Sequence, residues 1–358
     1  MKIRKILSLA FASALLFNVA CSDDDFVNET PQMDYANGII IANEGGFTTP
    51  TSDVSYASND LGTVQNGIYS GNNGNEILGS VLQTVGFKGE NVYLVLNSPN
   101  KIEIVNKHTF KKQATVTSNL VNPRYIAYSG NQYYVTNNNF GTVKKLNVYN
   151  VSDNSFVKSI NFDRSAEKVV EAGGNIIVQT DGVTYDTTAP YAEHPTGHTI
   201  TIVNTSSNTV STTVNLPPAE GIIRDLVSYN GFAYVLTSND TASYIYKINP
   251  STGTYATTTL TTIPQVQKLR IDSDKFYFVD YSKVYSMNIN SSTAPTSPLI
   301  TTTGIANLYG FNVIDGRIFI SDAKNFSSDS KVFVYNANNG SQLTTFNTGI
   351  ATNGFYKN

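Results

Sequence analysis

The chain has no tryptophan, one cysteine and three histidines, and charged residues make up only 14% of its 358 positions. One cysteine cannot form an intramolecular disulfide, so strand pairing and apolar packing must hold the fold together. Three scattered histidines, at positions 108, 194 and 198, argue against a histidine-based catalytic cluster. With a net charge of −3, the chain lacks the excess of positive charge that is typical of nucleic-acid-binding proteins. The composition therefore argues against a disulfide-stabilised fold, a histidine-based catalytic site and nucleic-acid binding.

Long helical patterns are also missing beyond the N-terminus, because no stretch repeats apolar residues with a 3.6-residue period. Valine, isoleucine, tyrosine, phenylalanine and threonine are abundant instead, which favours an all-β protein. The sequence contains no G-x-S-x-G, no P-loop and no Rossmann glycine run. We therefore expect a protein that is not an enzyme, with no catalytic residue, metal ion or cofactor.

A turn pair followed by a short β-rich burst occurs seven times, as in GENVYLVLNS and NGFAYVLTSND. Aligning the bursts gives intervals of 53, 41, 43, 57, 43 and 42 residues between Ile40, Tyr93, Tyr134, Ile177, Tyr234, Tyr277 and Phe319. A period near 42 residues with β texture is typical of propeller blades. Four-stranded sheets with two apolar faces bury both faces only by stacking in a ring. The sequence predicts a seven-bladed β-propeller of four-stranded antiparallel blades.

The two ends of the chain complement each other. Residues 350–355 resemble an innermost strand such as 123–128, yet the chain stops soon afterwards. The first burst, 38–43, has no innermost strand before it. We therefore expect the C-terminal strand to join the N-terminal blade and close the ring, which removes an exposed edge.

The first 20 residues are typical of an export signal, with a basic start and an apolar stretch too short to span a bilayer. Cys21 follows at once, which resembles a bacterial lipoprotein signal, although Asn18 stands where leucine is usual. An ordinary cleaved signal with a stray cysteine is the alternative. The acidic run after Cys21 resembles the surface-export signal of Bacteroidota lipoproteins. We expect residues 1–20 to be a signal peptide, 21–34 a lipidated tether and 35–358 the propeller.

Several motifs in the first three blades resemble one family. They are N-E-G-G-F at 43–47, G-N-E-I-L-G-S-V-L-Q at 74–83, K-I-E-I-V at 101–105 and N-P-R-Y-I at 122–126. In these motifs the chain is similar to the YncE-like surface lipoproteins of Bacteroidota, the DUF5074 type. Beyond residue 170 the likeness is one of blade periodicity, and Ser80, Leu82 and Thr84 depart from the usual G-D-x-A-Q-S stretch.

The resemblance implies a function in ligand capture. BtuG-type members of this group capture cobalamin at the cell surface and pass it to a TonB-dependent outer-membrane transporter. The chain is then expected to bind cobalamin or a related corrinoid while lipid-anchored in the outer membrane, facing the cell exterior. Because propellers host many unrelated functions, a surface module that binds glycans or a protein partner is the alternative.

Loops between the second and third strands share one face of a propeller with the loops between blades, so binding residues are expected there. Aromatic rings offer stacking area and asparagines offer both donors and acceptors, a mixture that suits a large, polar, partly planar ligand. Asparagine and aspartate are also common in such turns for conformational reasons. The expected ligand-binding residues are Asn43, Glu44, Phe47, Asn97, Arg124, Asn138, Phe140, Tyr185, Tyr191, Asp240, Tyr281, Asp322 and Phe326.

An insertion in the fourth blade, residues 181–198, lengthens one interval to 57 residues. Long loops on a rigid scaffold tend to be functional, so this loop is expected either to form a flap over the ligand or to be a surface loop without a partner. His194 and His198 are four residues apart, which suits a metal only on a helix, and Pro195 and Gly197 argue against a helix there. Residues 67–79 are expected to form a similar rim.

Overall fold

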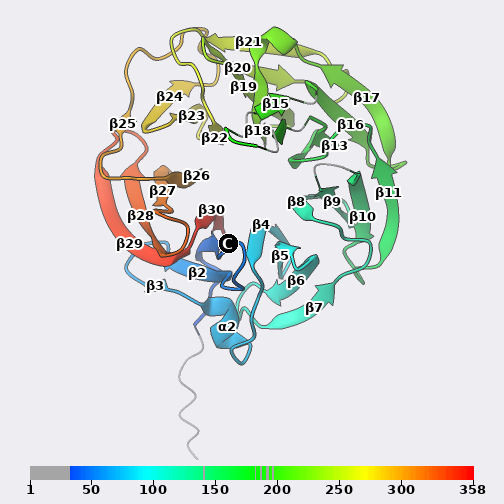
Figure 1. Cartoon of the computed structure of the whole chain (residues 1–358), viewed down its shortest axis with the longest axis vertical. Coiled ribbons are helices and arrows are strands. Elements are labelled where there is room, and N and C mark those ends of the chain that lie inside the picture. Colours follow the sequence, from blue (N-terminus) through cyan, green and yellow to red (C-terminus); the bar gives the residue numbers. More distant parts are fainter. Residues whose placement is uncertain (1–32, 140–141, 182, 186–187, 191–192, 196) are drawn as a thin grey trace, which may run out of the picture. The chain divides into compact units, whose positions relative to one another are not determined.

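The structure is a computed structural model that describes residues 33–139, 142–181, 183–185, 188–190, 193–195 and 197–358. Asp34–Asn358 forms one compact unit, in which seven four-stranded antiparallel sheets are arranged in a ring (Figure 1). The prediction of a seven-bladed, all-β propeller is confirmed. No described helix is long and apolar enough to span a membrane.

Blades two to seven place their strands in chain order from the ring axis outward. The strands of blade two are β4 Val81–Lys88, β5 Asn91–Ser98, β6 Lys101–Asn106 and β7 Lys112–Val116, and those of blade three are β8 Pro123–Ser129, β9 Gln132–Asn138, β10 Lys144–Asn150 and β11 Phe156–Asn161. Blade four contains β12 Val169–Ala172, β13 Asn175–Gln179, β16 Thr199–Asn204 and β17 Thr209–Asn215. Blade five, preceded by the 3-10 helix η1 Pro218–Glu220, contains β18 Ile222–Tyr229, β19 Phe232–Ser238, β20 Ser243–Ile248 and β21 Tyr255–Leu260.

Blade six contains β22 Lys268–Asp272, β23 Lys275–Asp280, β24 Lys283–Asn288 and β25 Ile300–Thr301, and blade seven contains β26 Leu308–Ile314, β27 Arg317–Asp322, β28 Asp329–Asn336 and β29 Gln342–Ile350. Two-residue turns join the first and second strands of blades two to seven. Gly89, between β4 and β5, has a φ of 61°, a conformation that glycine adopts without steric cost. The turn pairs seen in the sequence therefore mark the hairpins between first and second strands.

Blade one is assembled from both ends of the chain. Its strands are, from the axis outward, β30 Thr352–Lys357, β1 Gly38–Asn43, β2 Asp53–Ser58 and β3 Val64–Gln65. β1 pairs antiparallel with β30, and Ile41 lies opposite Phe355. The predicted closure of the ring by the C-terminal strand is confirmed, and β1 is paired on both edges, with β30 and with β2.

The core lies between blades rather than inside them. Seven apolar clusters of described residues each join two neighbouring blades. In the cluster between blades two and three, Tyr93 contacts Tyr133, and Tyr133 stacks on Tyr149 with ring centroids 5.0 Å apart. The registered aromatic and aliphatic positions of the bursts are therefore the inter-blade packing residues, as expected for strands with two buried faces.

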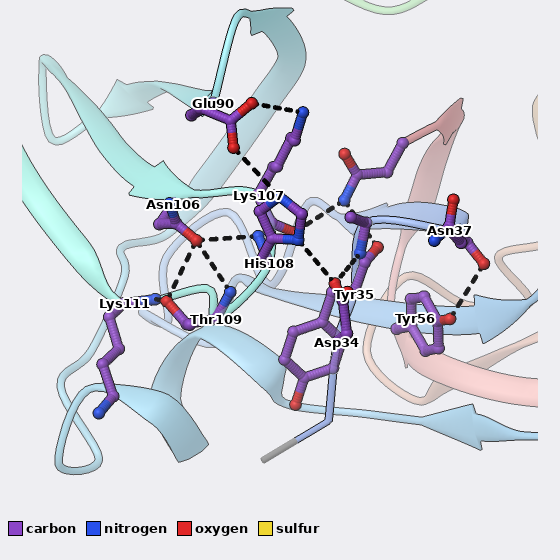
Figure 2. A network of polar contacts seen from close by, with 12 residues as sticks. Asp34, Tyr35, Asn37, Tyr56, Glu90, Asn106, Lys107, His108, Thr109 and Lys111 are labelled. Atoms are coloured by element: carbon purple, nitrogen blue, oxygen red, sulfur yellow. Dashed lines mark hydrogen bonds and ion pairs between the residues drawn. The ribbon is translucent and has the colours of Figure 1, made fainter.

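The chain enters the propeller through a polar network that Figure 2 shows. His108 lies in the turn between β6 and β7 and contacts both Asp34, through Nδ1, and Glu90, through Nε2, each at 3.0 Å. The side-chain amide of the C-terminal Asn358 donates to the backbone oxygens of Tyr35 and Lys107 at 2.7 and 2.9 Å. Both ends of the compact unit Asp34–Asn358 are thus fastened to blade two, and His108 has a structural contact there.

The segment expected to form a rim near residues 67–79 instead contains a short helix, α2 Ile68–Asn72. Ile68 and Tyr69 are fully buried in the cluster between blades one and two. Asp53 accepts hydrogen bonds from the backbone of Tyr69 and Ser70 at 3.1 and 3.4 Å. The expected rim is therefore wrong for the start of this segment, which packs against the core because β3 alone is too short to cover the blade.

Candidate functional site

We call one side of the ring the loop face. It comprises the described residues of the loops between second and third strands, residues 44–52, 99–100, 139, 142–143, 180–181, 183–185, 188–190, 193–195, 197–198, 239–242, 281–282 and 323–328, together with the loops between blades, residues 79–80, 117–122, 162–168, 216–221, 261–267, 302–307 and 351. The insertion in blade four lies here and contains a two-stranded hairpin of β14 Val183–Tyr185 and β15 Glu193–Pro195. Antiparallel geometry brings all these loops to the same side of the seven sheets.

Exposed aromatic side chains gather on the loop face. Phe47 is 84% exposed, Tyr281 61% and Phe326 43%, and the ring of Phe326 lies edge-on to Tyr309 at 5.0 Å. Val121, also exposed, belongs to an inter-blade loop of the same face, and the exposed Ile77 lies in the segment that joins blades one and two. The other exposed large apolar residues are Met33 and side chains of outermost strands, namely Val157, Val210, Tyr255 and Leu343. Unburied apolar rings on one face are a typical mark of a binding surface.

A hydrogen-bonded network surrounds the axis at the loop face. Arg124, at the start of β8, donates to Glu167 through Nε and Nη2 at 2.9 and 2.7 Å, and to Gln83 through Nη1 at 2.7 Å. Asn138 donates to the second oxygen of Glu167, and Asn97 donates to Gln83, both at 3.0 Å. Three expected binding residues, Arg124, Asn138 and Asn97, are thus brought together by blades two and three.

Glu44 extends this network on the side of blades one and seven. Its carboxylate accepts hydrogen bonds from Tyr309 Oη and from Asn353 Nδ2, the latter at 3.3 Å. Burial raises the pKa of the Glu44 carboxyl above its ordinary value, against the effect of these donors and of Arg124. Burial, with the charge of Glu44 nearby, also raises the pKa of Tyr309.

A cavity of about 310 Å³ lies at the ring axis and adjoins this network, because Gln83, Tyr309 and Asn353 line it. The innermost strands line it, and its three charged lining residues, Lys168, Lys268 and Arg270, are all basic. Asp225, only 1% exposed, pairs with Lys168 and, at 2.8 Å, with Arg270. Burial opposes ionisation of Asp225, but the charges of Lys168 and Arg270 outweigh it and hold the carboxyl pKa well below its usual range.

Other expected binding residues have structural contacts. Asn43 is buried and bonds Ser55 at 2.8 Å and Thr352 at 2.7 Å, so it fastens β1 to β2 and β30. Asp322 is also buried and accepts from the backbone of Asn307 and Lys324, both at 2.9 Å. Both side chains stabilise the local backbone conformation, which is the usual role of such residues at strand ends.

Asp240 and Tyr281 are joined through Gln265, which donates to Asp240 at 2.7 Å and accepts from Tyr281 Oη. This chain of contacts connects the loops of blades five and six on the loop face. Phe140, Tyr191 and Cys21 lie outside the described residues, and Tyr185 lies on β14, whose side chains are not described.

The sequence prediction missed the inner wall of the ring. Seven residues of this wall were not predicted as functional. They are Gln83, Glu167 and Asn353 of the network, and Lys168, Asp225, Lys268 and Arg270 of the Asp225 cluster and its cavity. A signal was present, because K-L-R at 268–270 places two cations in a strand of a chain that is poor in charge. Alternation of charged and apolar residues on an innermost strand directs the charges toward one face of that strand.

A second hollow, of about 320 Å³, lies at the loop face between blades three and four. Thr180, Thr199 and Thr201 line it, and Thr180 Oγ1 contacts the hydroxyls of the other two at 3.0 and 2.7 Å. Within the part of the chain that the structure describes, no three His, Cys, Asp or Glu residues gather in a way that could hold a metal ion.

The ring, its exposed aromatic face and its polar axis fit a ligand-binding or partner-binding propeller module. The family model of DUF5074, a domain of unknown function, matches residues 37–358, and the chain belongs to this family. No curated protein matches the chain.

Solved structures show the same fold. The chain is similar to a protein from Lactobacillus plantarum, with 11% identity, a TM-score of 0.65 and coverage of 89% of this chain and 98% of that one. It is also similar to a functionally unknown protein from Desulfotomaculum acetoxidans DSM 771, with 13% identity, a TM-score of 0.63 and the same coverage. The computationally designed Ika8 protein matches with 9% identity, a TM-score of 0.57 and 90% coverage of both chains. At such identities the likeness concerns the fold alone.

Proposed function

We propose that the protein is a non-catalytic ligand-capture module whose loop face binds a large, polar, partly planar molecule, namely cobalamin or a related corrinoid. The observation that carries this proposal is that the exposed rings of Phe47, Tyr281 and Phe326 all lie in loops of one face, in the neighbouring blades one, six and seven. Leaving three large rings in water costs free energy in the unbound protein, so a partner that covers them gains that energy on binding.

A corrinoid fits the chemistry of this face. Its macrocycle offers a broad face for stacking on aromatic side chains, and its side-chain amides can donate to carboxylates and accept from amide groups. Glu44, Asn97 and Asn138 supply such groups around the axis. The ligand's amides would then exchange hydrogen bonds with the network while its ring contacts Tyr281 and Phe326.

The proposal includes delivery. Lipidation at Cys21 would hold the protein in the outer membrane facing the exterior, and a TonB-dependent transporter is the proposed partner that receives the corrinoid. The sequence features that support this part are the export signal of residues 1–20, the cysteine that follows it and the likeness of the first three blades to the YncE-like surface lipoproteins, a group that includes the BtuG-type proteins. Metabolic labelling with a fatty-acid analogue tests it, and loss of label in Cys21→Ser is expected.

Calorimetric titration of cyanocobalamin tests the ligand. We expect one-to-one binding that weakens by about 30-fold or more in the double variant Tyr281→Ala/Phe326→Ala, since aromatic anchors typically contribute about 1–2 kcal/mol each. Tyr255→Ala is the matched control, because Tyr255 is a comparably exposed ring on the outermost strand of blade five. Absence of heat with cobalamin, or equal losses in both variants, would contradict the proposal.

Glycan capture is the second candidate, favoured by the threonine-lined hollow between blades three and four. Its hydroxyls and the nearby Arg164 and Asn215 offer donors and acceptors suited to sugar hydroxyls. A soluble oligosaccharide panel titrated beside cobalamin decides between the two. Binding of a glycan that is weakened by Thr201→Val, together with no cobalamin binding, would favour this second candidate.

A further inference from the structure

The cavity on the ring axis contains more positive than negative charge. Lys168, Lys268 and Arg270 line it, and the only carboxylate in contact with these three among the described residues is Asp225. One carboxylate pairs with two of the cations, so the cluster keeps an excess of two positive charges. Buried like charges repel one another strongly in a medium of low dielectric constant, so the folded chain must hold this excess at a cost.

Lys268 is the cation without an acceptor. Its ammonium lies 5.9 Å from the centroid of the Tyr309 ring, and no described residue makes a hydrogen bond or ion pair with Nζ. Burial, together with the charges of Lys168 and Arg270, lowers the pKa of Lys268 to about 8. A partly buried ammonium at a cavity wall normally finds a partner, since unpaired polar groups are costly.

An unpaired acceptor lines the same cavity. Asn353 Oδ1 is buried and has no hydrogen-bond donor among the described residues, while its Nδ2 donates to the backbone oxygen of Leu82 at 2.8 Å. The amide orientation is therefore fixed by a bond on its other side. The cavity thus offers a cation that needs an acceptor and an acceptor that needs a donor.

We propose that this axial cavity is a binding site for a phosphate group, as the free ion or as a small phosphomonoester. A dianion balances the two excess charges, and its oxygens can accept from Lys268. Hydrogen phosphate carries a hydroxyl that can donate to Asn353 Oδ1, and an ester such as glycerol 3-phosphate can donate from its alcohol hydroxyls, whereas sulfate has no donor. A volume of about 310 Å³ is at the lower end of the range for small-molecule sites, so it suits an ion or a short ester.

The site is independent of the corrinoid proposal, because it depends on the inner wall and not on the exposed rings. Calorimetric titration of the purified protein with inorganic phosphate, sodium sulfate and glycerol 3-phosphate tests it at pH 7. We expect phosphate to bind about fivefold tighter than sulfate, through the additional hydrogen bond to Asn353. Tighter binding of glycerol 3-phosphate than of phosphate would identify an ester as the occupant, and the reverse would identify the free ion.

The variant Lys268→Met should weaken phosphate and sulfate binding by at least about tenfold, as expected for a lost charge-assisted hydrogen bond. It should still fold, because it removes an unpaired, partly buried charge, and its melting temperature checks this. Lys111→Met is the matched control, since Lys111 is an exposed lysine in a turn on the opposite face of the ring.

A pH series with sulfate provides a second test that needs no variant, because sulfate stays a dianion. Four groups face or adjoin Lys268, namely Lys168, Arg270, Asp225 and Tyr309. The pKa of Asp225 is lowered and that of Tyr309 is raised, so neither acid titrates between pH 7 and 9.5. Sulfate affinity should fall about 30-fold over that range as Lys268 loses its proton, and should stay level in Lys268→Met.

Three results would overturn the proposal. They are no binding of phosphate or sulfate at millimolar concentration, unchanged affinity in Lys268→Met, and a sulfate affinity in the wild-type protein that does not fall above pH 8. Sulfate binding as tight as phosphate would overturn the assignment to phosphate. A failed cobalamin titration beside successful phosphate binding would contradict only the corrinoid proposal.

Discussion

Replacing Asp225 by asparagine should destabilise the propeller while strengthening anion binding. The carboxylate accepts hydrogen bonds from the backbone of Leu226 and Leu269, at 2.9 and 3.0 Å, and pairs with Lys168 and Arg270. Breaking a buried charge pair typically costs 3–5 kcal/mol. The side chains of Lys168 and Arg270 are 22% and 27% exposed, so water offsets part of the loss, and we expect about 3 kcal/mol.

The expected shift in melting temperature follows from the size of the unit. An unfolding entropy of about 2.1 cal/mol/K per residue gives roughly 0.7 kcal/mol per kelvin for Asp34–Asn358, so 3 kcal/mol corresponds to about 4 °C. Calorimetric or circular-dichroism melting at pH 7 measures the shift. Asp329→Asn, a change of an exposed carboxylate in blade seven, is the control and should shift the melting temperature by less than about 1 °C.

The pH dependence has a definite sign. The carboxyl pKa of Asp225 is lower in the folded protein than in the unfolded chain, so its contribution is fully present above the unfolded value, near 3.9, and is lost as the pH falls toward the folded value. The gap in melting temperature between wild type and Asp225→Asn should therefore be constant from pH 5 to 7 and shrink below pH 4. A gap under about 1 °C at pH 7 would refute the reasoning.

Phosphate should bind the variant more tightly, since Lys168 and Arg270 lose their carboxylate.

Two further predictions concern the closure and Glu44. Deletion of residues 350–358 removes β30 and the buried Phe355, and should lower the free energy of unfolding by at least about 4 kcal/mol, from the aromatic burial alone; an unchanged melting temperature would contradict the closure. Burial raises the carboxyl pKa of Glu44 in the folded protein. Ionisation of Glu44 therefore lowers the free energy of unfolding as the pH rises through and above the ordinary pKa of a glutamate carboxyl. Glu44→Gln should remove that part of the pH dependence between pH 4 and 7, and identical pH profiles of the melting temperature for wild type and variant would disprove it.

The propeller could be predicted from the sequence because its strongest determinant is local and repeated. Each burst combines a turn that tolerates positive φ with a strand whose residues are apolar on both faces, and seven copies at a near-constant spacing leave few other architectures. The closing strand was predictable for the same reason, since residues 350–355 match an innermost strand that the first blade lacks.

The loop face was harder to predict. Antiparallel order places Glu44, Arg124 and Asn138 on one side, and the structure does bring them to one network. The same rule also selected Asn43 and Asp322, whose side chains make local hydrogen bonds instead. Residue type and loop position cannot separate a polar side chain of the axial network from one that fastens a strand, because both satisfy the same turn chemistry.

The axial cavity escaped prediction because it depends on which blades are neighbours. Lys168, Asp225 and Arg270 are far apart in the chain and belong to blades four, five and six, and side chains from all three blades come together near the axis. Buried ion pairs are seldom the cheapest way to stabilise a fold, and apolar residues of similar volume often do as well or better. A chain with 14% charged residues that nevertheless places three cations around one buried carboxylate, and leaves Lys268 without an acceptor, has an arrangement that stability alone does not explain. Binding of an anion explains it, because the anion supplies the missing charge and the missing acceptor together.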